Sequence, residues 1–82
     1  MEIKVYGAGW CGDTQRTLRQ LDELGVDYNY IDVEKDAAAS QWVKDRNGGK
    51  EQKPTVDIAG RVLSVPTNAE LESALREAGV TV

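Results

Sequence analysis

The sequence predicts an α/β fold in which a mixed four-stranded sheet carries helices on both faces. Three observations lead to this class. Short β-branched and aromatic segments alternate with amphipathic ones along the 82 residues. The first strand–helix–strand unit must pair its two strands in parallel through a right-handed crossover. The last two strand-like segments are joined by a tight turn and form an antiparallel hairpin. The predicted element order is therefore β-α-β-α-β-β-α.

The first half of the chain is expected to form a strand, a helix and a second strand. Residues 2–6 alternate between apolar and polar side chains, and the glycine-rich segment 7–9 forms a turn. A helix follows from near Cys11 to Leu24. Residues 28–33 are rich in aromatic and β-branched side chains and predict the second strand. The expected apolar stripe of the helix consists of three leucines: Leu18, Leu21 and Leu24.

The second half is expected to contain a helix, a hairpin and a final helix. Asp36 is the predicted N-cap of a helix that runs to about Arg46. Residues 54–59 and 61–65 predict the two strands of the hairpin. In the helix that begins after Asp36, the predicted core residues are Trp42 and Val43.

The last helix has the clearest start signal in the sequence. Thr67 and Glu70 fit a capping box, in which each side chain satisfies a backbone N–H group of the other residue. Gly79 follows the helix as a stop signal. Its predicted buried stripe is Leu71, Ala74, Leu75 and Ala78.

Composition excludes several classes of function. A single cysteine rules out an internal disulfide, and the absence of histidine argues against a metal site and a Cys–His hydrolase. A net charge of −4 argues against nucleic-acid binding. No apolar segment is long enough to cross a membrane, and the first residues do not resemble a signal peptide. We expect a single domain over residues 1–82 that is monomeric and cytoplasmic.

The one cysteine lies where chemistry is favoured. Residues 9–14 read GWCGDT and place Cys11 between a flexible loop and a helix start. Unpaired backbone N–H groups and the helix dipole at that position favour a thiolate and lower the pKa of a thiol. Asp13 opposes this effect because a nearby carboxylate disfavours a second negative charge. The alternative is a small, buried, inert cysteine, since free cysteines are often buried.

Three further features of the sequence bear on the site. Pro54 opens a strand, and the local sequence alone predicts an ordinary trans bond before it. Thr67 and Asn68 either receive a carboxylate at a helix N-terminus or only cap that helix. Trp10 either shields the thiol or stacks on a partner.

The order and spacing of several motifs resemble those of the glutaredoxin family of the thioredoxin fold, closest to small bacterial, mycoredoxin-like members. The likeness covers essentially the whole chain. The matching segments are Trp10-Cys11 after the first strand, the Gly48-Gly49 bend, Lys53-Pro54-Thr55-Val56 at the third strand, and the polar pair Thr67-Asn68.

This resemblance implies roles for individual residues. The bond before Pro54 would be cis, and the backbone of Lys53 would pair with the bound thiol substrate. Lys53 replaces the usual apolar residue, and its cation would stabilise a thiolate at Cys11. The resemblance implies Cys11 and Thr14 as catalytic residues and the following thiol-binding set: Trp10, Gly12, Asp13, Lys53, Pro54, Thr55, Thr67 and Asn68.

The same resemblance leaves the identity of the thiol open. Thr67 and Asn68 would receive the γ-glutamyl end of glutathione or part of a related thiol. The family usually has a basic residue just before the cysteine, whereas residues 7–9 carry no charge. Glutathione and another low-molecular-weight thiol are therefore both retained as co-substrates, with no tightly bound cofactor expected.

Thr14 is the largest departure from the family pattern. Dithiol members have a second cysteine at this position, so Cys11 cannot be resolved within this chain. The leading expectation is a monothiol oxidoreductase that acts on mixed disulfides of small thiols and proteins, with a hydrogen bond from Thr14 to the thiolate. The alternatives are a monothiol carrier of a [2Fe–2S] cluster and a redox-inert interaction module.

Overall fold

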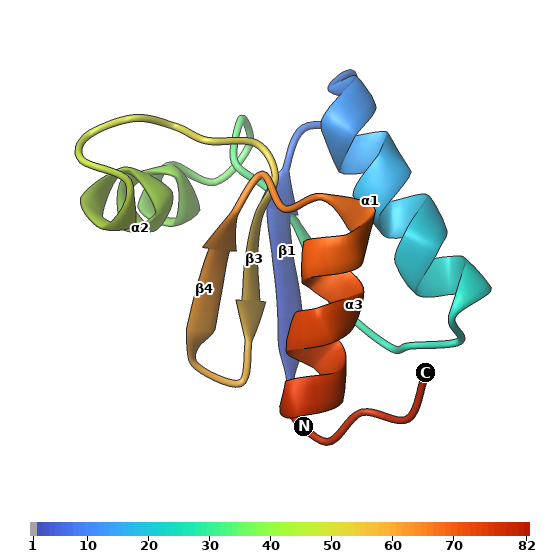
Figure 1. Ribbon diagram of the computed structural model, residues 1–82. Coiled ribbons are helices and arrows are strands. Elements are labelled where there is room, and N and C mark those ends of the chain that lie inside the picture. The colour runs from blue at the N-terminus through green and yellow to red at the C-terminus, as the bar shows by residue number, and fades with distance from the viewer. Residues whose placement is uncertain (1) are drawn as a thin grey trace.

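The predicted element order is confirmed in the computed structural model, which describes residues 2–82 (Figure 1). The strands form one mixed sheet in the order β2-β1-β3-β4. Helices α1 and α3 lie on one face of this sheet, and α2 lies on the other (Figure 1). The elements are β1 (Ile3–Gly7), α1 (Gly12–Glu23), β2 (Asn29–Asp32), α2 (Ala37–Arg46), β3 (Thr55–Ile58), β4 (Arg61–Ser64) and α3 (Asn68–Glu77).

Strand pairing explains how distant segments meet at one end of the sheet. Strand β1 is parallel to β2 and antiparallel to β3, and β3 is antiparallel to β4. In the β1–β3 ladder, Tyr6 pairs with Thr55. The carboxyl end of β1, which leads to Cys11, therefore lies beside the start of β3, which follows Pro54.

The two faces of the sheet have separate hydrophobic cores. The face under α1 and α3 buries the inward residues of β1 and β3 against Leu21, Leu71, Ala74 and Leu75. The predicted leucine stripe of α1 was only partly right, since Leu18 and Leu24 are half-buried. The fully buried residues of this helix are Thr14, Thr17 and Leu21.

The face under α2 has a smaller core around Val33, Ala39 and Val43. Val43 is buried as predicted, whereas Trp42 is half-buried at the edge of this core. The indole of Trp42 stacks on Tyr6 with ring centroids 4.4 Å apart. The guanidinium of Arg46 lies 3.8 Å from the Trp42 ring centroid, so Trp42 is held between a core residue and a surface cation.

Local signals in the sequence set the element ends. Asp36 accepts a hydrogen bond from the Ala39 N–H at 3.0 Å, and the capping box of Thr67 and Glu70 is present. The β3–β4 turn has positive φ at both Ala59 (51°) and Gly60 (100°), as hairpin turns of type I′ require. These ends agree with the predicted boundaries to within one or two residues.

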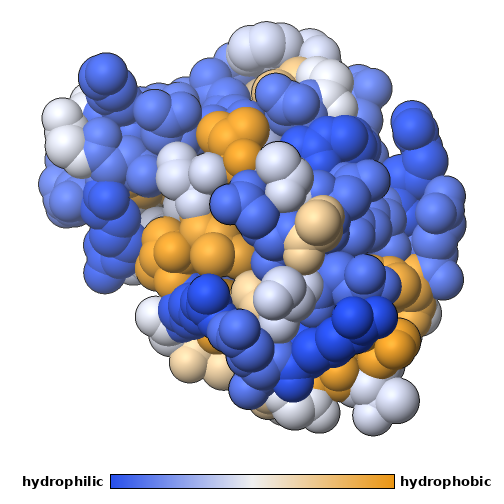
Figure 2. Space-filling model, in the orientation of Figure 1, coloured by the Kyte–Doolittle hydropathy of each residue, from blue (hydrophilic) through white to orange (hydrophobic). Residues whose placement is uncertain are grey.

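Hydrophilic residues cover most of the face shown in Figure 2, and hydrophobic residues are visible in a few separate patches. Among residues 2–82, no helix has the length and hydropathy needed to span a bilayer.

Candidate functional site

Cys11 is the N-cap residue of α1, as the sequence predicted for the cysteine. Its backbone is extended (φ −79°, ψ 121°), and its carbonyl accepts the first helical hydrogen bond from the Gln15 N–H at 3.0 Å. The side chain is half-buried, and its Sγ lies 3.7 Å from the carbonyl oxygen of Lys53. The bond between Lys53 and Pro54 is cis, as the family resemblance implied. The thiol is therefore accessible and lies beside the cis-proline loop.

Several opposing effects act on the Cys11 thiol, and their sum lowers its pKa below the ordinary value. Burial raises the pKa and is the largest single effect. Hydrogen bonds from the backbone and side chain of Thr14 and from the backbone of Asp13 lower the pKa, and together they outweigh burial. The Asp13 carboxylate raises the pKa, but its contribution is smaller than any of these. The helix start therefore favours the thiolate despite the neighbouring acid.

Thr14 is fully buried directly below the thiol. Its Oγ1 accepts a hydrogen bond from the buried Ala8 N–H at 3.4 Å, and the hydroxyl group also hydrogen-bonds Cys11 in the interaction that lowers its pKa. A Cβ added at Gly7 would lie 2.6 Å from both Thr14 Oγ1 and Cγ2. A glycine at the end of β1 is thus required for Thr14 to pack under Cys11.

The ammonium of Lys53 does not extend freely into solvent. Its Nζ forms an ion pair with Glu51 at 2.8 Å and lies 5.0 Å from the ring centroid of Trp10. The hydrogen bond to Glu51 is the main cause of a raised Lys53 pKa, and Cys11 contributes least of the causes. The expected cation is therefore near the thiol, but Glu51 already neutralises it.

Trp10 lies on the surface next to Cys11 and is 66% exposed. Its indole Nε1–H donates a 2.7 Å hydrogen bond to the carboxylate of Glu34, in the loop after β2. The indole is consequently held at its edge by Glu34 while Lys53 lies over its ring.

Thr55 supports the site from inside. It is fully buried, and its hydroxyl donates to the Gln52 carbonyl at 2.9 Å and accepts from the Asn47 amide at 3.3 Å. The Pro54 carbonyl accepts a 2.8 Å hydrogen bond from the Val65 N–H. The side chain of Thr55 therefore holds the cis-proline loop in place and is not exposed to a substrate.

Thr67 and Asn68 lie at the exposed start of α3 and are joined to α1. Arg16 donates to the Asn68 Oδ1 at 2.6 Å and to the Pro66 carbonyl at 3.1 Å. It also lies 3.6 Å from Asp13, which is mostly exposed beside the equally exposed Gly12. The Glu70 carboxylate accepts from the Thr67 N–H at 2.8 Å, so this donor is already used by the capping box. The remaining free N–H groups of the helix start are those suited to a ligand carboxylate.

Sequence reasoning named the thiol, the proline loop and the α3 start as candidate positions, but it did not predict the side-chain contacts made there. These contacts are Arg16 to Asn68, Glu34 to Trp10 and Glu51 to Lys53, and they span 52, 24 and 2 residues of sequence, respectively. Two of these contacts join distant segments, and an exposed charged side chain on a helix or loop carries no periodic signal for such a contact.

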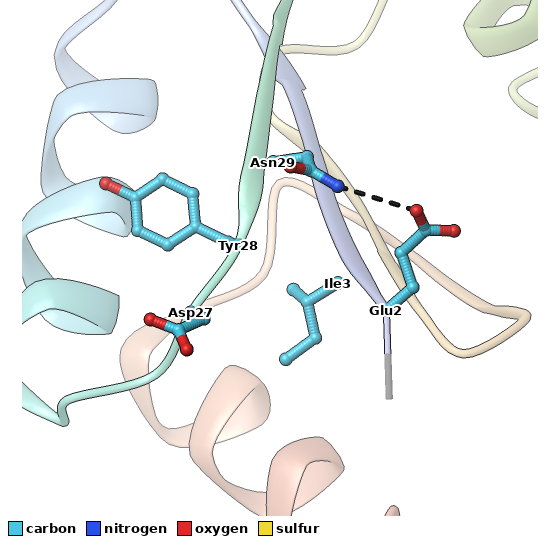
Figure 3. A pocket seen from close by; sticks show the side chains of 5 residues that line it. All are labelled: Glu2, Ile3, Asp27, Tyr28 and Asn29. Carbon is cyan, nitrogen blue, oxygen red and sulfur yellow. Dashed lines mark hydrogen bonds between the residues drawn. The ribbon is translucent and has the colours of Figure 1, made fainter.

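Two cavities differ in their distance from the site. One of about 390 Å³, shown in Figure 3, lies at the amino end of β1, the end opposite Cys11, and is lined by Glu2, Ile3, Asp27, Tyr28 and Asn29. A smaller one of about 210 Å³ lies between α1 and the start of α3, and its lining includes Arg16 and Asn68. No group of three or more potential metal-ligating side chains occurs within residues 2–82. The smaller cavity adjoins Asn68, the candidate carboxylate-binding position at the α3 start.

Comparison with known proteins supports the interpretation of this surface. The glutaredoxin family model matches residues 3–63. Mycoredoxin 1 of Corynebacterium glutamicum is 39% identical over 70 residues, which cover 84% of this chain and 86% of that protein. Together, the family match and this relative support a thiol redox role.

Solved structures agree on the fold. A mutant of the thioredoxin-like protein BC3987 superposes with a TM-score of 0.80 at 30% identity, over 90% of this chain and 99% of that one. The glutaredoxin-like NrdH-redoxin of Escherichia coli has a TM-score of 0.77 at 23% identity, over 89% and 93% of the two chains. With a thiol at the start of α1 beside a cis-proline, the chain belongs to the glutaredoxin family.

Proposed function

We propose that this chain is a monothiol thiol–disulfide oxidoreductase that removes small thiols from mixed disulfides through Cys11. The observation that carries the proposal is the half-buried Cys11 Sγ at the start of α1, 3.7 Å from the carbonyl that precedes cis-Pro54. Its pKa is lowered by helix-start hydrogen bonds, and the thiolate is the attacking species in disulfide exchange.

The reaction takes two exchange steps. The Cys11 thiolate attacks the small-thiol sulfur of a mixed disulfide, a new disulfide forms on Cys11, and the substrate thiol leaves and takes up a proton. A second small thiol, as thiolate, then attacks the small-thiol sulfur now bound to Cys11 and expels the Cys11 thiolate. The substrate cysteine is thereby reduced, and one external small thiol is consumed because it leaves as a disulfide with the small thiol taken from the substrate. The chain has no second cysteine, so an external thiol must complete the cycle.

The surrounding residues have separate tasks in this scheme. Thr14 stabilises the thiolate, and the backbone of Lys53 pairs with the substrate. The N–H groups at the start of α3 that the capping box leaves free, beginning with that of Asn68, receive a carboxylate where the small thiol has one. Glutathione and a thiol without a charged end are both candidate co-substrates, and thiolated proteins are the candidate partners. We expect the chain to act as a monomer in the cytoplasm.

The proposal is tested with a peptide whose one cysteine carries a small thiol, together with excess external thiol. With the wild-type protein, the small thiol should be released at a rate proportional to the protein concentration. With Cys11→Ser, the release should occur at the uncatalysed rate. Equal rates for the two proteins would exclude the proposed activity. Parallel assays with the glutathione adduct and the 2-mercaptoethanol adduct show whether the protein accepts a small thiol with carboxylates, one without them, or both.

The cluster-carrier alternative is less well supported by the residues around the thiol. A [2Fe–2S] cluster needs four ligands, usually thiolates, and this chain supplies one. The other ligands would come from a second copy of the chain and from glutathione. Residues 7–9, just before the cysteine, carry no cation that could hold glutathione. Anaerobic reconstitution with iron and sulfide should therefore give no visible cluster absorbance.

A further inference from the structure

Among residues 2–82, two large hydrophobic side chains are exposed. The exposed fraction is 66% for Trp10 and 39% for Tyr30. Trp10 directly precedes Cys11, whereas Tyr30 lies on the edge strand β2. A large exposed apolar side chain beside a reactive residue is a candidate contact for a substrate.

Trp10 is exposed but not free to move. Its Nε1–H is held by Glu34 at 2.7 Å, and the Lys53 ammonium lies over its ring, 5.0 Å from the centroid. Lys53 is fixed in turn by Glu51, whose other carboxylate oxygen accepts a hydrogen bond from the Ser40 hydroxyl of α2. We call Trp10, Glu34, Lys53 and Glu51 the indole clamp.

The indole clamp lies where the side chains that flank a substrate disulfide would be. A substrate sulfur must reach Cys11 Sγ, and the indole lies beside that atom because Lys53 contacts both: its carbonyl is 3.7 Å from Sγ and its Nζ lies over the Trp10 ring. Trp10 remains 66% exposed, so much of the indole is open to a substrate group. A rigid indole binds an apolar or aromatic side chain with little loss of conformational entropy.

We propose that Trp10 is a specificity-determining residue, positioned by Glu34 and Lys53, that binds the apolar side chain adjacent to the modified cysteine of a peptide or protein substrate. This inference rests on the proposed function and adds the substrate class to it. Glu34 touches neither the thiol nor the substrate in this arrangement, and it acts as a positioning residue.

The test uses two peptides that differ only beside the cysteine. Both carry the cysteine as a mixed disulfide with 2-mercaptoethanol, which is uncharged, and its neighbours are phenylalanine in one peptide and glycine in the other. An aromatic contact on the indole should give wild type a KM about threefold to tenfold lower for the phenylalanine peptide. The kcat should be similar for the two peptides.

Three variants separate positioning from general damage. Trp10→Ala should abolish the difference in KM, and Glu34→Ala should reduce it at least by half. Glu34→Gln retains a carbonyl acceptor for the indole and should preserve most of the preference. Glu23→Ala removes the same charge from the far end of α1 and is the matched control, with an unchanged KM ratio.

A second readout follows the indole directly. Tryptophan anisotropy, with the Trp10→Ala signal subtracted to remove Trp42, should fall in Glu34→Ala because the ring is released. The rate of Cys11 alkylation by iodoacetamide should stay the same in that variant, because small reagents do not need the indole.

The outcomes distinguish the two proposals. If wild type processes both peptides through Cys11 with the same KM, the inference on Trp10 is wrong and the oxidoreductase proposal stands. Retention of the full preference in Glu34→Ala would also overturn the inference, because the indole would then need no clamp. If neither peptide is processed faster than by Cys11→Ser, both proposals fall.

Discussion

Replacing Thr14 by valine should make Cys11 a weaker acid. Valine has the shape of threonine without the hydroxyl, so the hydrogen bond from Thr14 to Cys11 is lost while the packing against Gly7 remains. Hydrogen bonds to a charged group contribute about 1.5–3 kcal/mol. Sulfur is a weak acceptor and Cys11 is half-exposed, so we expect a smaller effect. With 1.36 kcal/mol per pKa unit, the pKa of Cys11 should rise by about 0.5–1.

The consequence for the rate at neutral pH is smaller than the change in thiolate fraction. A rise of about 0.5–1 in the pKa lowers the thiolate fraction roughly threefold to tenfold below the pKa. The more basic thiolate is also a better nucleophile, with a Brønsted coefficient of about 0.4–0.5. Where the pH is below the pKa of Cys11, alkylation of Thr14→Val should therefore be about twofold to fourfold slower than that of wild type.

The assay is the rate of Cys11 alkylation by iodoacetamide, measured against pH. Thr17→Val is the matched control, because Thr17 is also fully buried on α1 and its hydroxyl has no hydrogen-bond partner. It should leave the pKa of Cys11 unchanged. An unchanged pKa in folded Thr14→Val, or an equal rise in Thr17→Val, would refute the role given to the Thr14 hydroxyl.

Three other predictions follow from the same site. Gly7→Ala should cost about 1–3 kcal/mol in the free energy of unfolding measured with urea, because its Cβ would overlap Thr14, whereas Gly9→Ala has open space and should cost less. Thr14→Cys should form an intramolecular disulfide with Cys11 under mild oxidation, and two free thiols by mass spectrometry would contradict this. Because the folded pKa of Cys11 is lowered, the unfolded chain binds more protons between that pKa and the ordinary pKa of an unfolded thiol. The stability of wild type relative to Cys11→Ser should therefore rise with pH across this interval, and a flat difference would contradict the lowered pKa.

Most of the fold could be predicted because its signals are local. The alternation around Ile3 and Val5, the cap at Asp36 and the capping box at Thr67 each depend on a few neighbouring residues. The placement of Cys11 beside Pro54 also followed from the sequence once the family resemblance was stated. In the structure, the antiparallel register of β1 and β3 brings the segment with Cys11 next to Pro54.

The interior of α1 could not be predicted in the same way. Periodicity selected leucines, whereas the helix turns Thr14 and Thr17 fully inward and leaves Leu18 and Leu24 half-buried. At position 14 burial is compatible with threonine because the methyl group packs and the hydroxyl bonds Ala8 and Cys11, whereas the Thr17 hydroxyl is buried without a partner. Only the close approach of Gly7 shows why the side chain at position 14 must be small.

The partners of Cys11 also connect its protonation to substrate binding. The neutral thiol is placed to donate to the Lys53 carbonyl at 3.7 Å, whereas the thiolate has no proton to donate and is stabilised by Thr14 and Asp13. Deprotonation therefore frees the Lys53 carbonyl at the moment when the sulfur becomes a nucleophile. That carbonyl belongs to the residue whose backbone we assign to the substrate. The same ionisation that activates the sulfur would thus make an acceptor available to the incoming chain, and the lowered pKa of Cys11 would favour binding as well as attack.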